Sequence, residues 1–162
     1  MLIQEPQQAI SSTQLPGATS VPSSFEALLP ALQFASTFSK TSGRFAPTSI
    51  LIEIFGTLAA PALAGPITDG ILLGLAGHRT TDRDQANGLL KTIRSTKSLR
   101  LNGSIESIEV PFIAAEHLIL SSNALLPNHP DGIRLTAYHC MHPFLTRQFY
   151  ASSTSPLTFT EC

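Results

Sequence analysis

Tryptophan is absent from the sequence, and only 13% of its 162 residues are charged. Soluble domains usually carry about 25% charged residues. Serine and threonine replace the missing charge, rather than the lysine and glutamate that are typical of disordered chains. The formal net charge is −1, so no global field favours binding to nucleic acid or to an anionic membrane surface. Without tryptophan, a stacking platform for carbohydrate is not expected either.

Cysteine is equally scarce, since the chain holds only Cys140 and Cys162. A structural disulfide framework is therefore not expected, and a reducing compartment is the default. No lysine or arginine precedes Lys40, and no apolar leader stands at the N-terminus. A secretory signal or a transit peptide is therefore not expected. We expect a cytoplasmic protein, with a membrane-associated protein as the alternative.

A chain of this length accommodates one domain with a sizeable core. Residues 1–22 are rich in Gln, Ser, Thr and Pro and show no apolar period, which indicates a flexible N-terminal arm. Residues 152–162 have the character of a C-terminal tail. The interval 23–151 is expected to form a single α+β domain.

Apolar periodicity of 3.6 residues predicts helices in the first half of this domain. One begins at Ser23 or Ser24 and ends near Gly43, and Pro30 is expected either to kink it or to start a second helix. Another begins at Asp82 or the residue before it, with an apolar face opposite a charged face.

Between these helices, residues 47–55 predict a strand because they are rich in β-branched side chains. Pro66 suits the first position of a helix. The helix that follows, over residues 67–77, is apolar on nearly every side.

The later half of the domain shows the pattern of β-structure. Asn102-Gly103 suits a type I′ turn and predicts a hairpin between short apolar runs. Residues 133–138 alternate between apolar and polar side chains, as a strand does. Residues 112–126 fit a helix or a strand, and a strand over 117–126 would form a hairpin with 133–138. The predicted fold is α+β: a small single domain with an antiparallel β-sheet packed around a central apolar helix, and one or two amphipathic helices.

The apolar stretch at residues 50–77 has two interpretations. Gly70-xxx-Gly74 is a spacing of small residues that lets membrane helices approach closely. A membrane span, however, needs about 20 predominantly apolar residues, and Glu53 and Asp69 bracket a shorter uncharged run that holds two prolines. A buried core helix after a buried strand is the favoured interpretation, and membrane insertion is the alternative.

Three residues are candidates for acid–base catalysis: Asp69, His139 and His142. A carboxylate inside an apolar helix is desolvated, and its raised pKa would suit proton transfer near neutral pH. Strand alternation puts His139 in phase with the apolar residues of 133–138 and puts His142 on the opposite face with Cys140. We therefore expect Asp69 and His139 to line one cavity.

Four further residues are assigned to ligand binding: Glu53, His117, Tyr138 and Cys140. The polar cluster that also holds His129 and Asp131 has weak spacing for zinc, so we expect no metal site. No phosphate-binding loop or other cofactor motif is present, and no cofactor is expected.

The predicted function is that of a small-molecule-binding domain with an apolar pocket for a hydrophobic metabolite. Acid–base catalysis of the isomerase, cyclase, dehydratase or thioesterase type is a further expectation, so whether the chain is an enzyme stays open. The alternatives are a membrane-associated accessory protein that inserts residues 50–77, and a non-catalytic dimerising interaction module. The expected partners are a hydrophobic small molecule and a second copy of the chain, with a membrane as an option and no nucleic acid.

Overall fold

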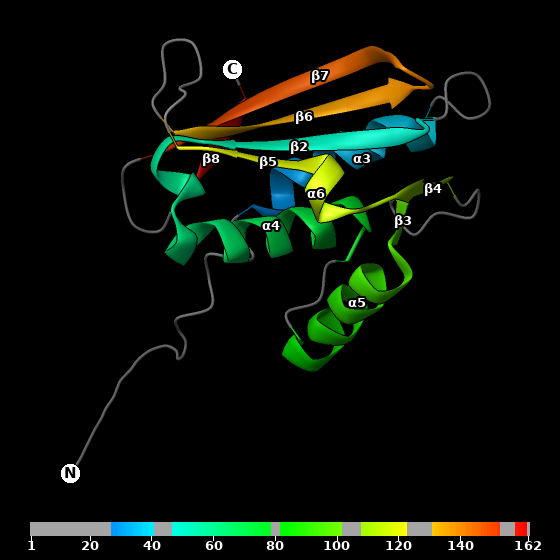
Figure 1. The fold of residues 1–162 in the computed structure, drawn as a ribbon, viewed down its shortest axis with the longest axis horizontal. Helices are drawn as coiled ribbons and strands as arrows, with labels where there is room; N and C mark the ends of the chain where they lie inside the picture. The colour runs from blue at the N-terminus through cyan, green and yellow to red at the C-terminus, as the bar shows by residue number, and fades with distance from the viewer. Residues whose placement is uncertain are drawn as a thin grey trace.

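The computed structural model describes residues 27–40, 47–78, 82–101, 108–122, 131–152 and 158–161. Within them the predicted α+β class is confirmed, because helices accompany a five-stranded sheet and a separate hairpin (Figure 1). The helices are α3 (Leu28–Lys40), α4 (Pro61–Leu75), α5 (Arg83–Thr96) and α6 (Ala114–His117), and a 3-10 turn, η1 (Gly56–Ala59), precedes α4. The strands are β2 (Ser49–Phe55), β3 (Ser98–Leu101), β4 (Ile108–Pro111), β5 (Leu118–Ser121), β6 (Gly132–His139), β7 (His142–Ala151) and β8 (Phe159–Glu161). The predicted arm over residues 1–22 lies outside the described residues.

The main sheet has the strand order β5-β2-β6-β7-β8. Strand β5 runs parallel to β2, whereas the other neighbours are antiparallel, so the sheet is mixed rather than purely antiparallel as predicted. The hairpin predicted between 117–126 and 133–138 is also wrong. A strand does form at 118–121, but β2 lies between it and β6, because β2 is apolar enough to be buried with a neighbour on each side.

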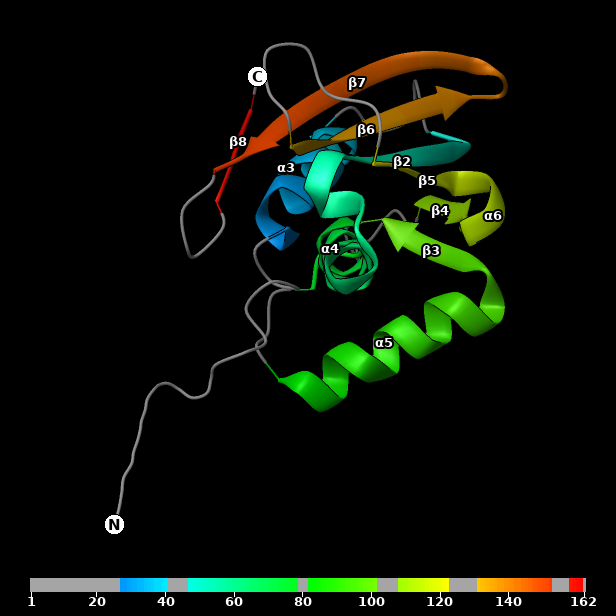
Figure 2. The same cartoon turned by 60° about the vertical axis from the view of Figure 1, so that its left-hand side comes forward.

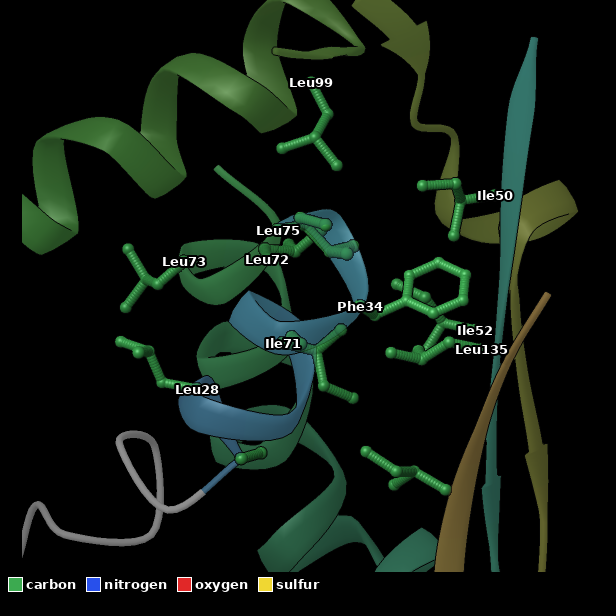
Figure 3. Packing of buried hydrophobic residues seen from close by; sticks show 14 of the residues in the cluster. Leu28, Phe34, Ile50, Ile52, Ile71, Leu72, Leu73, Leu75, Leu99 and Leu135 are labelled. Atoms are coloured by element: carbon green, nitrogen blue, oxygen red, sulfur yellow. The ribbon is translucent and has the colours of Figure 1, made fainter. Parts of the chain in front are cut away.

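The apolar stretch at residues 50–77 forms the centre of the core, as the favoured interpretation predicted. Ile52 and Ile54 of β2, and Ile67 and Ile71 of α4, are each at most 1% exposed. Figure 3 shows Ile71, Leu72 and Leu75 of α4 grouped with Phe34 of α3 and with Ile50, Ile52 and Leu135 of the sheet. In the part of the chain that the structure describes, no helix combines the length and hydropathy that a membrane crossing requires.

The helices lie on one side of the five-stranded sheet. Figure 2 shows α3 and α4 beneath the sheet, with α5 on the far side of α4. Helix α4 is thus covered from both sides, which explains why nearly every face of it is apolar. The opposite face of the sheet, which we call the outer face, is covered by none of the described helices in either view (Figures 1 and 2).

Two prolines test the predicted helix boundaries. Helix α4 begins at Pro61 rather than after Pro66, so Pro66 lies inside the helix. An interior proline destabilises a helix by about 3 kcal/mol because it removes a backbone hydrogen bond. The buried side chains of the following turns of α4 offset this loss. Pro30 lies in the first turn of α3, where no intrahelical N–H donor is needed, and of the two predicted alternatives the kink is not required.

Helices α3 and α4 cross at Gly74. A Cβ atom at this position would lie 2.2 Å from the Leu28 carbonyl oxygen and 2.7 Å from the Ala31 Cβ atom. Only a residue without a side chain permits this approach. The small-residue spacing that suggested a membrane helix therefore serves helix packing inside a protein core.

The amphipathic helix and the early hairpin are confirmed. Asp82 is the N-cap of α5, and its carboxylate accepts hydrogen bonds from the backbone N–H groups of Asp84 and Gln85. Strands β3 and β4 form an antiparallel hairpin in which Leu101 pairs with Ile108. Residues 102–107, which lie outside the described residues, therefore separate the strands, and the predicted two-residue turn at Asn102-Gly103 is wrong. Strand β8 lies within the predicted tail and pairs with β7.

Candidate functional site

The outer face of the sheet carries the side chains that alternate with the core residues of each strand. In β2 these are Ser49, Leu51 and Glu53, which are partly exposed while Ile50, Ile52 and Ile54 are buried. The strand register aligns them with residues of the neighbouring strands, so Ile119, Glu53 and Arg134 form one row across the sheet.

A hollow of about 390 Å³ lies on this face, between the first residues of β2, the α6–β5 segment and the β6–β7 turn. It forms because α6 interrupts the extended chain just before β5, so that β5 pairs with only the second half of β2. The hollow combines apolar and polar side chains. Its lining residues are Ser49, Leu51, Glu116, His117, Ile119, Tyr138, Cys140 and Met141.

Three of the four residues predicted to bind a ligand line this hollow: His117, Tyr138 and Cys140. The Nδ1 atom of His117 accepts a hydrogen bond from the backbone N–H of Ile113 at 2.9 Å. In the neutral ring this bond places the proton on Nε2 and makes that atom a donor. Cys140 occupies the β6–β7 turn with a φ of 58° and is an exposed free thiol. Its N–H donates to the Thr48 hydroxyl at 2.7 Å.

Glu53, the fourth predicted ligand residue, is committed to an ion pair on the same face. Its two carboxylate oxygens accept hydrogen bonds from Arg134 Nε at 2.7 Å and from Arg134 Nη2 at 2.9 Å. The Glu53 side chain is only 14% exposed, and the guanidinium also lies 5.0 Å from the centre of the Phe55 ring. The hydrogen bonds to Glu53, together with the electrostatic attraction of Glu53 and Tyr138, raise the pKa of Arg134, while partial burial acts in the opposite direction.

Asp69 does not meet the histidines in either cavity that we describe. Its carboxylate lies 2.5 Å from Arg94 Nη2 of α5, so it faces the helix layer away from the sheet, whereas His139 ends β6 at the sheet (Figure 1). Neither Asp69 nor His139 lines either cavity, and the same holds for His142. The catalytic role of these three residues stays a prediction.

The arrangement predicted around the β6–β7 turn is wrong. His139 and His142 are direct cross-strand partners, so their side chains project to the same face. Strand alternation failed here because Cys140 and Met141 form a turn that reverses the chain. His139 is exposed beyond the end of the core, although Ile133 and Leu135 are fully buried. Among the described residues, no group of three or more His, Cys, Asp or Glu is placed to hold a metal ion; His129 lies outside them.

A second cavity of about 400 Å³ lies where α5, the end of α4 and the β3–β4 hairpin meet. Its rim holds Arg100 and Glu109, whose charged atoms are 3.8 Å apart and whose side chains are both 59% exposed. A pair this exposed contributes little to stability. The cavity contains none of the residues that the sequence assigned to catalysis or to ligand binding.

Sequence reasoning missed the apolar part of the outer-face hollow. Leu51, Ile119 and Met141 line it, and Ile119 and Met141 are 43% and 88% exposed. Exposed apolar side chains have no signature in the sequence, because local periodicity does not distinguish an apolar residue in the core from one at an uncovered edge.

Comparison with known proteins gives three findings. A family model described as "Serine dehydratase beta chain" matches residues 20–154. The L-serine dehydratase of Streptomyces coelicolor is 30% identical over 106 residues, which is 64% of this chain and 23% of that protein. The L-serine dehydratase TdcG of Escherichia coli is 27% identical over 115 residues, which is 69% of this chain and 25% of that protein. The chain thus spans about a quarter of the length of these relatives.

Proposed function

The chain belongs to the serine dehydratase beta chain family, and we propose that it supports the removal of water from L-serine as one part of a larger enzyme. The observation that carries the proposal is the extent of the family match, which includes every described element from α3 to β7. Both relatives bear the name L-serine dehydratase. Serine is polar, so the proposal replaces the hydrophobic metabolite that the apolar composition suggested.

Within this enzyme, we assign the chain an accessory role beside a catalytic portion. The relatives are about four times as long as the segment that the chain matches, which leaves ample chain for a separate catalytic domain. Asp69 is paired with Arg94, and neither Asp69 nor His139 lines a cavity described here. A proton-transfer group must come within about 3 Å of the substrate atom that it serves, and neither cavity described here brings these two side chains together.

The test combines the purified chain with the Streptomyces coelicolor L-serine dehydratase from which the matched segment has been removed. Loss of water from serine gives 2-aminoacrylate, which hydrolyses to pyruvate and ammonia, so pyruvate release measures the reaction. We expect no pyruvate from the chain alone, and binding together with restored activity when both parts are mixed. An unrelated α+β domain of equal size serves as the control. Absence of binding, or activity that is indifferent to the chain, would overturn the proposal.

A further inference from the structure

We propose that the outer-face hollow and the adjoining edge of β5 form the surface through which this domain docks onto the catalytic portion of the dehydratase. The inference rests on the proposed function and deepens it by naming the surface and the contact chemistry. We call Leu51, Ile119, Tyr138 and Met141, which line the hollow, the docking face.

Two of the exposed large hydrophobic side chains line the hollow, Ile119 of β5 and Met141 of the β6–β7 turn. Two others lie outside it: Leu120 is paired with the core residue Ile54, and the Phe144 ring contacts Phe38 of α3. The remaining exposed large hydrophobic residue in the described part of the chain is Leu29 of α3. Scattered apolar residues are ordinary on a protein surface, whereas Ile119 and Met141 line one hollow together with Leu51, which is typical of an interaction site.

The edge strand beside the hollow lacks the usual protection against association. Strand β5 is the terminal strand of the sheet, and among the described strands it pairs only with β2. Its residues, Leu-Ile-Leu-Ser, include no charge and no proline. Natural edge strands are commonly protected by lysine, by proline or by a covering element, so an apolar edge of this kind is expected to be covered in the working assembly.

The two charged side chains in the row beside the hollow are paired with each other. Glu53 and Arg134 satisfy each other through two hydrogen bonds, and Arg134 also stacks on Phe55. Burying one member of a charge pair without its partner is more costly than burying the complete pair, because in the complete pair each charge keeps its counter-charge. The row beside the hollow therefore opposes docking less than an unpaired charge would.

His117 determines which hydrogen-bonding group of the partner would fit the hollow. Its Nδ1 atom is occupied by the Ile113 N–H, which leaves Nε2 as a fixed donor on a ring that lines the hollow. Leu51, Ile119 and Met141 supply apolar walls around it. The matching contact is an apolar side chain of the partner with a carbonyl or carboxylate oxygen beside it, which is a usual combination at the centre of protein interfaces.

The occupant is assigned from the length of the relatives. About three quarters of each relative lies outside the segment that this chain matches, and the proposed function has that portion act together with this chain. The outer face is the sheet face that the described helices leave uncovered (Figure 2). The catalytic portion of the dehydratase is therefore the partner to which we assign it.

The test measures binding between the chain and the Streptomyces coelicolor enzyme lacking the matched segment. Ile119→Arg and Met141→Arg place a charge on the docking face, and Leu29→Arg is the matched control on α3. All three side chains are exposed, at 43%, 88% and 62%, so none of the variants should change the melting temperature by more than a few degrees. We expect at least tenfold weaker binding for the two docking-face variants and unchanged binding for Leu29→Arg.

The outcomes separate the two proposals. If the unmodified chain does not bind, the proposed function fails and the docking surface fails with it. If it binds and Ile119→Arg and Met141→Arg bind equally well, the docking surface alone is wrong. Sedimentation of the chain by itself tests the other occupant: a dimer that Ile119→Arg converts to monomer would assign the face to a second copy and overturn the inference.

Discussion

Gly74→Ala tests whether the fold depends on the close crossing of α3 and α4. The added Cβ atom would lie 2.2 Å from the Leu28 carbonyl oxygen, 2.7 Å from the Ala31 Cβ atom and 2.9 Å from the Leu32 nitrogen. Two of these atoms belong to the backbone of α3, so a side-chain rotation cannot relieve the overlap. The two helices would have to separate by about 1 Å, and the packing on both sides of α4 would have to adjust.

The expected loss follows from two opposing terms. Overpacking in a core costs about 1–3 kcal/mol, and three close contacts place Gly74→Ala at the upper end. Alanine gains about 1 kcal/mol over glycine in helix propensity. The net effect is a loss of about 2 kcal/mol in the free energy of unfolding, which corresponds to a melting temperature lower by about 4–8 °C for a chain of this size.

Thermal and urea unfolding followed by circular dichroism measure the effect, with Gly88→Ala of α5 as the matched control. A Cβ atom at Gly88 meets nothing within 4 Å, so only the propensity gain applies and the melting temperature should rise by about 2–4 °C. Gly65 is a poorer control, because it precedes Pro66 and a Cβ atom there would meet the proline ring. If Gly74→Ala is as stable as the unmodified chain, or if both variants shift in the same direction, the described helix crossing is wrong.

Three further predictions concern the core, the ion pair and the N-terminus. Leu72→Asp and Leu73→Asp should each prevent soluble expression, because both side chains are at most 1% exposed and an unpaired buried charge costs several kcal/mol; a soluble variant of normal stability would remove α4 from the core. Asp69→Asn should change the free energy of unfolding by no more than about 1 kcal/mol, since the pair with Arg94 is partly exposed, and should leave pyruvate release by the assembled enzyme unchanged; loss of activity with an intact fold would instead support the catalytic role predicted from sequence. Deletion of residues 1–22 should leave the melting temperature within a few degrees, because a segment without apolar period cannot offset its ordering entropy; failure to fold would show that the segment pairs with the domain.

Local features of the fold were predictable from local sequence. The N-cap at Asp82, the apolar face of α5 and the alternation in β6 each follow from side chains a few residues apart. The α+β class followed in turn, because the periods of helix and strand differ and the chain shows both. The contacts of the candidate catalytic residues were harder to predict. Asp69 forms an ion pair with Arg94 of another helix, and no local sequence pattern indicates that pairing.

The sequence by itself determined that this is an α+β domain with residues 50–77 at its centre, since the apolar content and charge pattern of that stretch suited a core better than a bilayer. Only the tertiary structure decided that β5 pairs in parallel with β2, and that His117, Tyr138 and Cys140 meet at one hollow. A strand can pair with any free strand edge in the molecule, and the pairing that forms is the one that buries the most apolar surface. A residue's own neighbours in the chain carry little information about that choice, because the pairing energy depends on segments far away in the sequence.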